Sequence, residues 1–351
     1  MPMTALTWAS LTRTVNDIKS PNNFINRLLF SNREAVTTEL IEIGIFSGGR
    51  EIAPFVKKNG EALMVGGVSE KFQEVSPTNI RIKRPFHASD LAYGRRPGTT
   101  IFPTSGQQSS AIQAAVARDM TFMADKLTNT EEYLACMALQ DTVTYSDADN
   151  ETFSITYPRP AGHDITAAAL WDAAIVADRQ MEADFRLAKK LISDDVGLQP
   201  TDVILGEEAA TEFLDTIKQL GHVLLNANNV NVGAINFAAN FQDSGGMYLG
   251  DFCGLRVWYY PRTVSVLGSS TPLIRDKYAE FVTASPAAEN VMYFGAIADN
   301  PTLRGQLLAV ERFSKSWEVP DPPVRYNLVA SRPLPVPRRP GSTVSMKVVS
   351  G

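Results

Sequence analysis

The longest regular pattern of apolar positions runs from about Gln107 to Leu139. The apolar members of this pattern are Ile112, Val116, Met120, Met123, Leu127, Leu134 and Met137. Their spacing of about 3.6 residues predicts one amphipathic α-helix, with Ser105 or Ser109 placed to cap its start. At about 1.5 Å per residue, the helix would be roughly 50 Å long. The pattern therefore predicts a strut that crosses the molecule.

Residues 46–102 show strand-like alternation and no helical pattern. Asn59-Gly60, within "FVKKNGEALMV", is typical of a two-residue hairpin turn, because both residues tolerate positive φ. Farther on, Ile80 and Ile82 alternate with charged residues as on a half-buried strand. A lone hairpin is only marginally stable in water. We therefore expect this hairpin to pack on a surface that its own neighbourhood does not supply.

The first 45 residues resemble an arm followed by an anchoring segment. Phe24, Leu28 and Leu29 have helical spacing, whereas Leu40, Ile43 and Ile45 alternate imperfectly. Neither piece is long enough to form a domain alone. The sequence predicts that both pieces pack on the rest of the chain.

After the long helix, residues 143–157 alternate around a polar turn and predict a second hairpin. An α+β unit follows. Its predicted elements are a helix at 168–192, a strand at 202–206, a helix at 207–220 and strands at 254–261, 290–300 and 307–317. The Asn- and Gly-rich residues 224–246 predict a long loop between two of these elements.

The C-terminal region is dense in proline and ends in an alternating strand. Proline lacks the N–H that a ladder needs, so these residues fit an edge strand or an extended strap better than a central strand. Val344, Met346 and Val348 form the apolar face of the final strand.

Composition describes an ordinary globular chain of 351 residues with 44% hydrophobic and 20% charged residues. The net charge of −5 argues against a dedicated nucleic-acid binder, which would need a basic face. We expect Cys136 and Cys253 to be buried thiols in a reducing cytoplasm, because they show no CxxC spacing. We also expect neither a secretory leader nor a membrane span, which would need roughly 18 to 20 apolar residues in a row.

The helix-poor region is unusually basic. Its cations include Lys57, Lys58, Arg81, Lys83, Arg84, Arg95 and Arg96. Two interpretations stay open: a solvated face, which is the usual role of surface charge, or a surface that docks on an acidic partner.

The search for catalytic chemistry finds little. His163-Asp164 could be an acid/base pair, but the favoured interpretation is that Asp164 caps a helix beginning at Ile165 or Thr166. "SDADN" lacks the central glycine and final glutamate of a calcium loop. No HExxH, GxSxG or Walker pattern is present. We expect no enzyme activity, cofactor or metal.

Several motifs, in order along almost the whole chain, resemble the major capsid proteins of lambda-type tailed bacteriophages. They are "NRLLF", "TTELIEIGI", "IAPFVKKNGEALMVGG", the long helix, "DVILGEEAATEFLDTIK" and "YLGDFCGLRVWYYP". The C-terminal block is the best match, at Trp317, Asp321, Pro322, Arg325, Ser331, Pro333 and Leu334. The loop at 224–246 matches least well.

The resemblance implies the Hong Kong 97-type capsid fold, of α+β class. It would divide the chain into an N-terminal arm at 1–45, an extended loop at 46–104, a peripheral domain at 105–162 and 306–351 with the long helix as its spine, and an axial domain at 163–305. The extended loop would lie across a neighbouring subunit. The implied contact residues are Lys57, Lys58, Asn59, Gly60, Arg81, Lys83 and Arg84 on the extended loop, and Glu131 and Glu132 on the spine helix.

The implied function is a structural one: a shell of hexamers and pentamers around double-stranded DNA, held without sequence specificity. The implied partners are a scaffold protein, a portal protein and a cementing protein. We expect the cementing protein in place of covalent crosslinks from Lys57 or Lys58. Assembly would take place in the host bacterial cytoplasm. Two alternatives are an encapsulin-like compartment shell and, below it, a hydrolase using His163 or His222.

Overall fold

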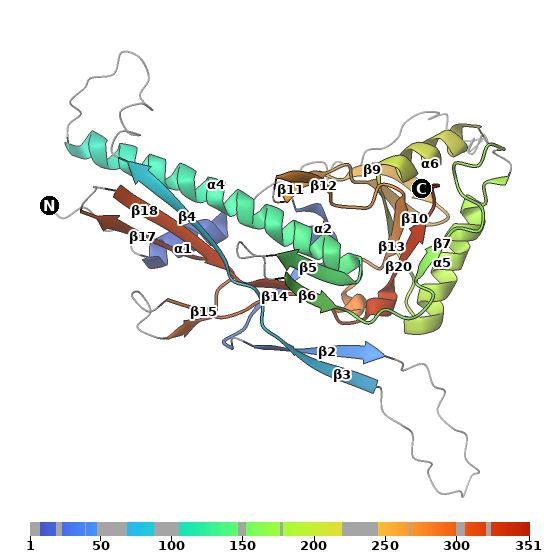
Figure 1. The fold of residues 1–351 in the computed structure, drawn as a ribbon, viewed down its shortest axis with the longest axis horizontal. Helices are drawn as coiled ribbons and strands as arrows, with labels where there is room; N and C mark the ends of the chain where they lie inside the picture. Colours follow the sequence, from blue (N-terminus) through green and yellow to red (C-terminus); the bar gives the residue numbers. More distant parts are fainter. Residues whose placement is uncertain are drawn as a thin grey trace, which may run out of the picture.

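The computed structural model describes residues 8–18, 23–38, 40–47, 69–87, 105–146, 152–175, 178–219, 245–266, 268–299, 306–320 and 324–351. A single long helix, α4 (Ser105–Leu139), runs along the long axis of the molecule (Figure 1). The predicted helix is confirmed and begins two residues earlier than expected. Among the described residues, no helix is both long enough and apolar enough to cross a membrane.

Helix α4 packs against two separate apolar cores. Toward its N-terminal end, Met120, Met123 and Leu127 are buried with Leu11 and Val15 of helix α1 (Trp8–Asp17). Toward its C-terminal end, the buried side chains belong to the largest core, which also holds residues of helix α2 (Phe24–Leu28); they are Leu134, Ala135, Cys136, Ala138 and Leu139. Because residues 116–139 of α4 contact both cores, this part of the helix connects them.

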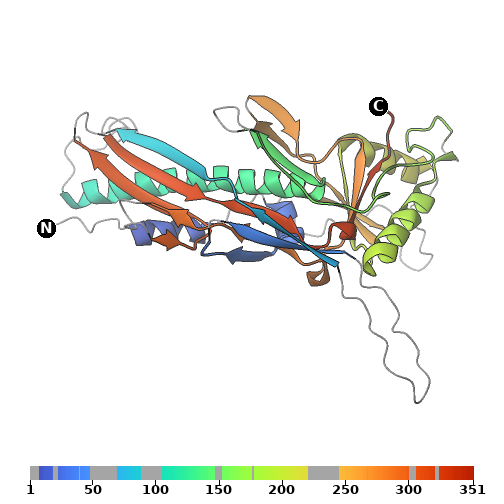
Figure 2. The same ribbon diagram turned by 60° about the horizontal axis from the view of Figure 1, so that its bottom comes forward.

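A three-stranded antiparallel sheet lies beside the N-terminal half of α4 (Figures 1 and 2). Its order is β17 (Phe313–Val319), β18 (Val324–Ser331) and β4 (Ile80–His87). The register places Ile82 opposite Val329, whose buried side chain contacts the core under α4. The predicted strand at Ile80 and Ile82 is confirmed.

A six-stranded sheet with two helices forms the other end of the molecule (Figure 1). Its order is β7 (Asp164–Thr166), β20 (Thr343–Lys347), β13 (Tyr278–Val282), β8 (Asp202–Leu205), β10 (Leu255–Tyr259) and β9 (Met247–Phe252). The helices are α5 (Met181–Val196) and α6 (Glu207–Gln219). The predicted elements at β8, α6 and β10 are confirmed.

The predicted helix at 168–192 is wrong in its first half. The Ala167 N–H donates to Lys347 O at 2.9 Å and the Trp171 N–H donates to Val348 O at 2.8 Å. These backbone groups bind the C-terminal strand, so they are not available to a helix. The predicted cap at Asp164 is also wrong, because Asp164 begins β7, which runs parallel to β20.

The last strand, β20, lies inside the six-stranded sheet between β7 and β13. The sequence-based division had placed all of 306–351 with the long helix. The difference arises because the chain crosses over after β19 (Pro333–Pro337), through the short 3-10 helix η4 (Pro340–Ser342).

The proline-rich strand β19 is an edge strand, as predicted. It pairs antiparallel with β14 (Asn290–Phe294), whose other neighbour is β1 (Asn32–Ala35). Alternate residues direct their backbone groups to opposite sides of a strand, so the prolines at 333, 335 and 337 can share the unpaired side. Accordingly, Pro335 O accepts a hydrogen bond from the Tyr157 O–H at 2.5 Å instead of from a strand.

Four two-stranded antiparallel ribbons complete the described fold. They are β2 (Ile41–Ser47) with β3 (Ser69–Val75), β5 (Thr142–Ser146) with β6 (Thr152–Thr156), β11 (Thr263–Val266) with β12 (Ser269–Pro272), and β15 (Ile297–Ala298) with β16 (Leu307–Leu308). A 3-10 turn, η3 (Pro286–Ala288), precedes β14. The predicted hairpin at 143–157 is confirmed as β5–β6. In β2 the residues Ile41, Ile43 and Ile45 are buried, whereas Leu40 is exposed, contrary to prediction.

We expect Gly206→Ala to destabilise the subunit by roughly 3 kcal/mol, because a Cβ there would lie 2.2 Å from the Arg275 carbonyl oxygen, a backbone atom that cannot rotate away. Urea unfolding of the unassembled subunit measures the loss. Gly162→Ala is the control. Its φ of +95° is unfavourable for alanine, but no atom lies within 4 Å of the added Cβ, so the expected cost is about 1 kcal/mol. Equal losses would contradict the close approach at Gly206.

Candidate functional site

The site lies where the N-terminal segment meets the C-terminal part of α4, around two consecutive glutamates. Glu132 accepts hydrogen bonds from the Ile25 N–H at 2.6 Å, the Asn26 N–H at 3.1 Å and the Tyr260 O–H at 3.0 Å. The first N–H groups of a helix have no partner inside that helix. The carboxylate of Glu132 supplies the partners for two such groups in α2 and fixes this segment to α4.

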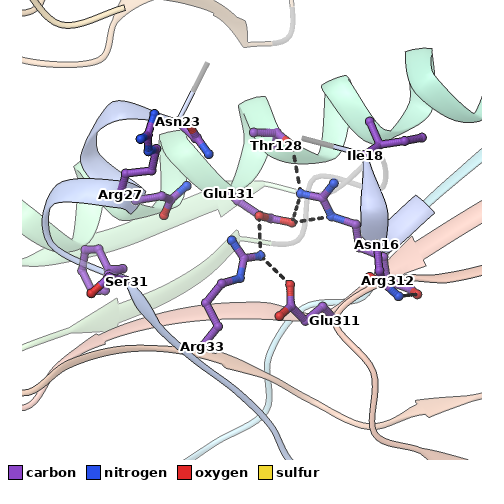
Figure 3. A pocket seen from close by; sticks show the side chains of 12 residues that line it. Asn16, Ile18, Asn23, Arg27, Ser31, Arg33, Thr128, Glu131, Glu311 and Arg312 are labelled. Atoms are coloured by element: carbon purple, nitrogen blue, oxygen red, sulfur yellow. Dashed lines mark hydrogen bonds and ion pairs between the residues drawn. The ribbon is translucent and has the colours of Figure 1, made fainter. Parts of the chain in front are cut away.

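Glu131 lies in a cluster of alternating charges. Arg312 donates to Glu131 Oε1 from Nη2 at 2.9 Å and from Nε at 3.1 Å, and it also donates to the Thr128 hydroxyl at 2.9 Å. Arg33 of β1 lies between two carboxylates: its Nη2 is 3.0 Å from Glu131 Oε2 and 2.9 Å from Glu311 Oε2 (Figure 3). These residues line a cavity of about 580 Å³ together with Asn16, Asn23, Asn26 and Arg27.

The electrostatics of the two glutamates differ. The Glu131 side chain is 1% exposed and is compensated by two guanidinium groups. Burial raises the pKa of Glu132 to about 7, although the N–H donors of α2, the Tyr260 hydroxyl and the charge of Arg262 all oppose that shift. Glu131 is therefore one member of a buried ion network, while Glu132 can carry a proton near neutral pH.

Both glutamates were predicted to face a neighbouring subunit, and the structure corrects that prediction. Their side chains are buried, and their partners belong to the same chain. Glu131 shares a helix face with Leu127 and Leu134, four residues before and three after it, so its position follows the apolar pattern of α4. The partners Arg33 and Arg312 are far away in sequence, and no local signal marked them.

Three of the basic contact residues predicted on the extended loop, Arg81, Lys83 and Arg84, lie on β4, beside α4. Arg84 pairs with Asp119 of α4 at 3.1 Å and Arg81 approaches Asp299 at 3.8 Å. The Lys83 ammonium lies 3.8 Å from the centre of the Tyr326 ring. The described contacts of Arg81, Lys83 and Arg84 are thus intramolecular. Lys57, Lys58, Asn59 and Gly60 lie outside the described residues.

The C-terminal block builds the sheet beside α4. Trp317 of β17 and Tyr326 of β18 pair across the ladder, with ring centres 5.6 Å apart. Arg325 donates to the Ser316 hydroxyl at 2.8 Å, and the Ser331 hydroxyl donates to Glu311 O at 2.7 Å.

The remaining members of the block are Pro333 and Leu334, which belong to the edge strand β19, where Leu334 is buried. Asp321 and Pro322 lie outside the described residues. The described members of the block therefore hold the fold together.

His163 is fully buried and its partners differ from the predicted ones. Its Nδ1 lies 2.8 Å from Thr343 O, and its Nε2 lies 2.5 Å from Asp195 of α5. It connects α5 to the start of β20 and does not pair with Asp164. His222 and the side chain of His87 are outside the described residues. No three potential metal-ligating side chains gather within the described part of the chain.

Cys136 is buried in α4 as expected, and Cys253 is only partly buried. Cys253 lies in the turn between β9 and β10, with a φ of 51°, instead of inside a strand.

The family model of phage major capsid protein E matches residues 7–348. A crystal structure of a proposed capsid protein from a prophage of E. coli CFT073 is similar over 98% of this chain and 99% of its own, with 16% identity and a TM-score of 0.71. A phage-related protein of Bordetella bronchiseptica RB50 is similar over 97% of this chain and 96% of its own, with 11% identity and a TM-score of 0.52. No curated protein sequence matches.

We expect Glu132→Gln to flatten the dependence of unfolding free energy on pH. The folded carboxyl has a pKa of about 7 against an ordinary 4.5, so folding favours the protonated form. Its contribution is fully present below about pH 4.5 and is lost as pH rises toward 7, by roughly 3 kcal/mol. Urea unfolding of the unassembled subunit at several pH values between these two limits measures this loss of unfolding free energy. Identical slopes for the two proteins would contradict the assignment.

We expect Arg312→Ala to cost roughly 3 kcal/mol of unfolding free energy, because it leaves the buried Glu131 with one guanidinium in place of two. Arg186→Ala is the matched control, because Arg186 forms an exposed ion pair with Glu182 one helical turn away. This substitution should cost under about 0.5 kcal/mol of unfolding free energy. Thermal unfolding of both variants compares them. A loss at position 312 no larger than that at 186 would show that the buried network contributes little.

Proposed function

The chain belongs to the phage major capsid protein E family, and from this membership we propose that neighbouring copies contact one another through residues 46–104. The family match over residues 7–348 carries the function. The protein is a structural subunit that assembles with its own copies into a phage capsid, and it is not an enzyme. Its fold is of the Hong Kong 97 type, and its place is in the virion.

We propose the following division of the chain. Residues 1–45 are the N-terminal arm and 46–104 the extended-loop region. The peripheral domain comprises 105–162 and 306–337, and the axial domain comprises 163–305 with 338–351. Membership of β20 in the six-stranded sheet supports moving the last residues from the peripheral to the axial domain.

The geometry at the base of residues 48–68 supports their role as a loop that reaches another subunit. Ser47 pairs with Ser69 across the β2–β3 ribbon, so the two ends of this segment lie side by side. A segment that leaves and returns at one place can extend over a neighbour without disturbing the fold below it. Lys57, Lys58, Asn59 and Gly60 are the proposed contact residues within it.

The proposed assembly consists of hexamers and pentamers formed in the host bacterial cytoplasm. The proposed partners are a scaffold protein, a portal protein, a cementing protein and double-stranded DNA bound without sequence specificity. The net charge of −5 suits a wall that encloses DNA without gripping it. The family match supports the role as a capsid subunit. The alternative role, as the shell of an encapsulin-like compartment, is less well supported.

We expect the full chain, co-expressed with the other head genes of its locus, to form closed shells visible by negative-stain electron microscopy. Deletion of residues 56–66, or Lys58→Glu, should leave a folded subunit that forms no shells, because these changes alter the loop and remove no side chain from the described apolar cores. Circular dichroism and size exclusion check the fold.

Normal particles from the deletion variant would contradict the role of the loop. A wild-type chain that stays monomeric with all partners present would contradict the proposed assembly itself.

A further inference from the structure

Helix α2 is held on one side by aromatic packing and by the carboxylate of Glu132. The centre of the Phe24 ring lies 5.2 Å from the centres of the Trp258 and Tyr260 rings. A helix of five residues is too short to be stable alone in water. The attachment of α2 therefore depends on these rings and on the hydrogen bonds that Glu132 accepts from it.

Another side of α2 borders the cavity of about 580 Å³ (Figure 3). Asn23, Asn26 and Arg27 line this cavity from the N-terminal segment, and Thr128 and Glu131 line it from α4. Atoms at a cavity wall lack packing partners across the gap, so they contribute less to the attachment. The amide group of Asn26 is also buried without a hydrogen-bond partner among the described residues, which is costly. On this side α2 is poorly packed.

Two opposing effects act on the charge of Glu132. Its Oε1 accepts hydrogen bonds from the Ile25 N–H and the Tyr260 O–H, and its Oε2 accepts one from the Asn26 N–H. These donors favour the ionised carboxylate, which only accepts hydrogen bonds. Burial disfavours the charge, and burial is the larger effect. The closed contact therefore holds the protonated form of Glu132 better than the ionised form.

The other described groups that face Glu132 keep their charge near neutral pH. Burial raises the pKa of Tyr260 and that of Cys136, one turn farther along α4, so both groups stay neutral. Arg262 carries a permanent charge that favours ionisation of Glu132, and it is the weakest of the named influences. The groups of α2 that contact the carboxylate are backbone N–H groups. The adjacent Glu131 is compensated by its own two arginines.

We propose that α2 is a latch, which opens locally from α4 and is held more tightly when Glu132 is protonated. When α2 moves away, water reaches the carboxylate, so an ionised Glu132 favours the open form. The pKa is about 7 in the closed form and returns toward the ordinary 4.5 in the open form. The extra stability of the closed form is therefore fully present below about pH 4.5 and is lost as the pH rises to 7.

The latch goes beyond the proposed function, because it is a property of the single subunit. Its consequence is that the N-terminal segment is attached tightly in acid and opens more often at neutral pH. The cavity beside α2 gives the segment room to move without displacing α4.

The first test is hydrogen exchange of the unassembled subunit, read by mass spectrometry of the peptide that contains α2. Exchange rates are corrected for the intrinsic effect of pH on unprotected amides. Between pH 5 and pH 8 the opening constant of α2 should rise roughly 70-fold, for a pKa of about 7 when closed and 4.5 when open. In Glu132→Gln, which cannot ionise, the opening constant should stay the same over this range.

The amides of β8 separate local opening from unfolding of the whole subunit. Strand β8 is paired on both sides, with β13 and β10, so its amides exchange only when the sheet opens. The peptide of α2 should exchange faster than that of β8 at every pH. Equal exchange rates in the two segments would mean that α2 opens only with the whole subunit, and would overturn the latch.

The second test changes the hydrogen bonds to the carboxylate. Tyr260→Phe removes a donor that favours ionisation, so the pH at which the opening constant levels off should rise by about one unit. Tyr157→Phe is the matched control, because the buried Tyr157 hydroxyl donates to Pro335 O instead. The control variant should leave that pH unchanged, even where it lowers the stability of the subunit.

Three results would overturn the proposal. An opening constant of α2 that stays flat between pH 5 and pH 8 in the wild-type chain would exclude proton control. A rise that persists in Glu132→Gln would assign the titration to another group. Equal shifts in Tyr260→Phe and Tyr157→Phe would show a general loss of stability instead of a change at Glu132.

Discussion

The attachment of the N-terminal segment to the C-terminal part of α4 is the constraint on which the other contacts depend. Glu132 holds the first amides of α2, and Glu131 holds Arg33 of β1 and Arg312, which precedes β17. Residues from the two ends of the chain thus meet on one turn of the long helix. Charges buried at this depth are stable only when their partners are in place, so the network favours a single arrangement of these segments. The apolar side chains of α2 add stability without that directional requirement.

Local periodic patterns of apolar residues predicted several helices and strands of the fold well. The 3.6-residue repeat of α4 and the alternation at β5–β6, β8 and β10 are local signals, because they need only one face of an element to be buried. The prediction failed where a long-range backbone partner decided the structure. Residues 167 and 171 have helical composition, yet their N–H groups bind residues 347 and 348. No local pattern near position 170 contains that information.

The candidate site was predictable only in part. Glu131 and Glu132 were predicted as partners of a neighbouring subunit, because charge alone suggested an exposed surface. Their burial follows from the helix phase, which places Glu131 in line with Leu127 and Leu134. Their arginine and backbone partners come from segments separated by about a hundred residues or more.

The position of β20 has a consequence for the timing of subunit production. This strand is synthesised after every other strand of its sheet, yet it lies between β7 and β13 and supplies Val344 and Met346 to the core of that end of the molecule. The six-stranded sheet therefore cannot close before β20 has been synthesised, whereas α4 and β5–β6 can form much earlier. Translation products that end before β20 would lack a closed six-stranded sheet, so this end of the molecule becomes complete only when that strand is made.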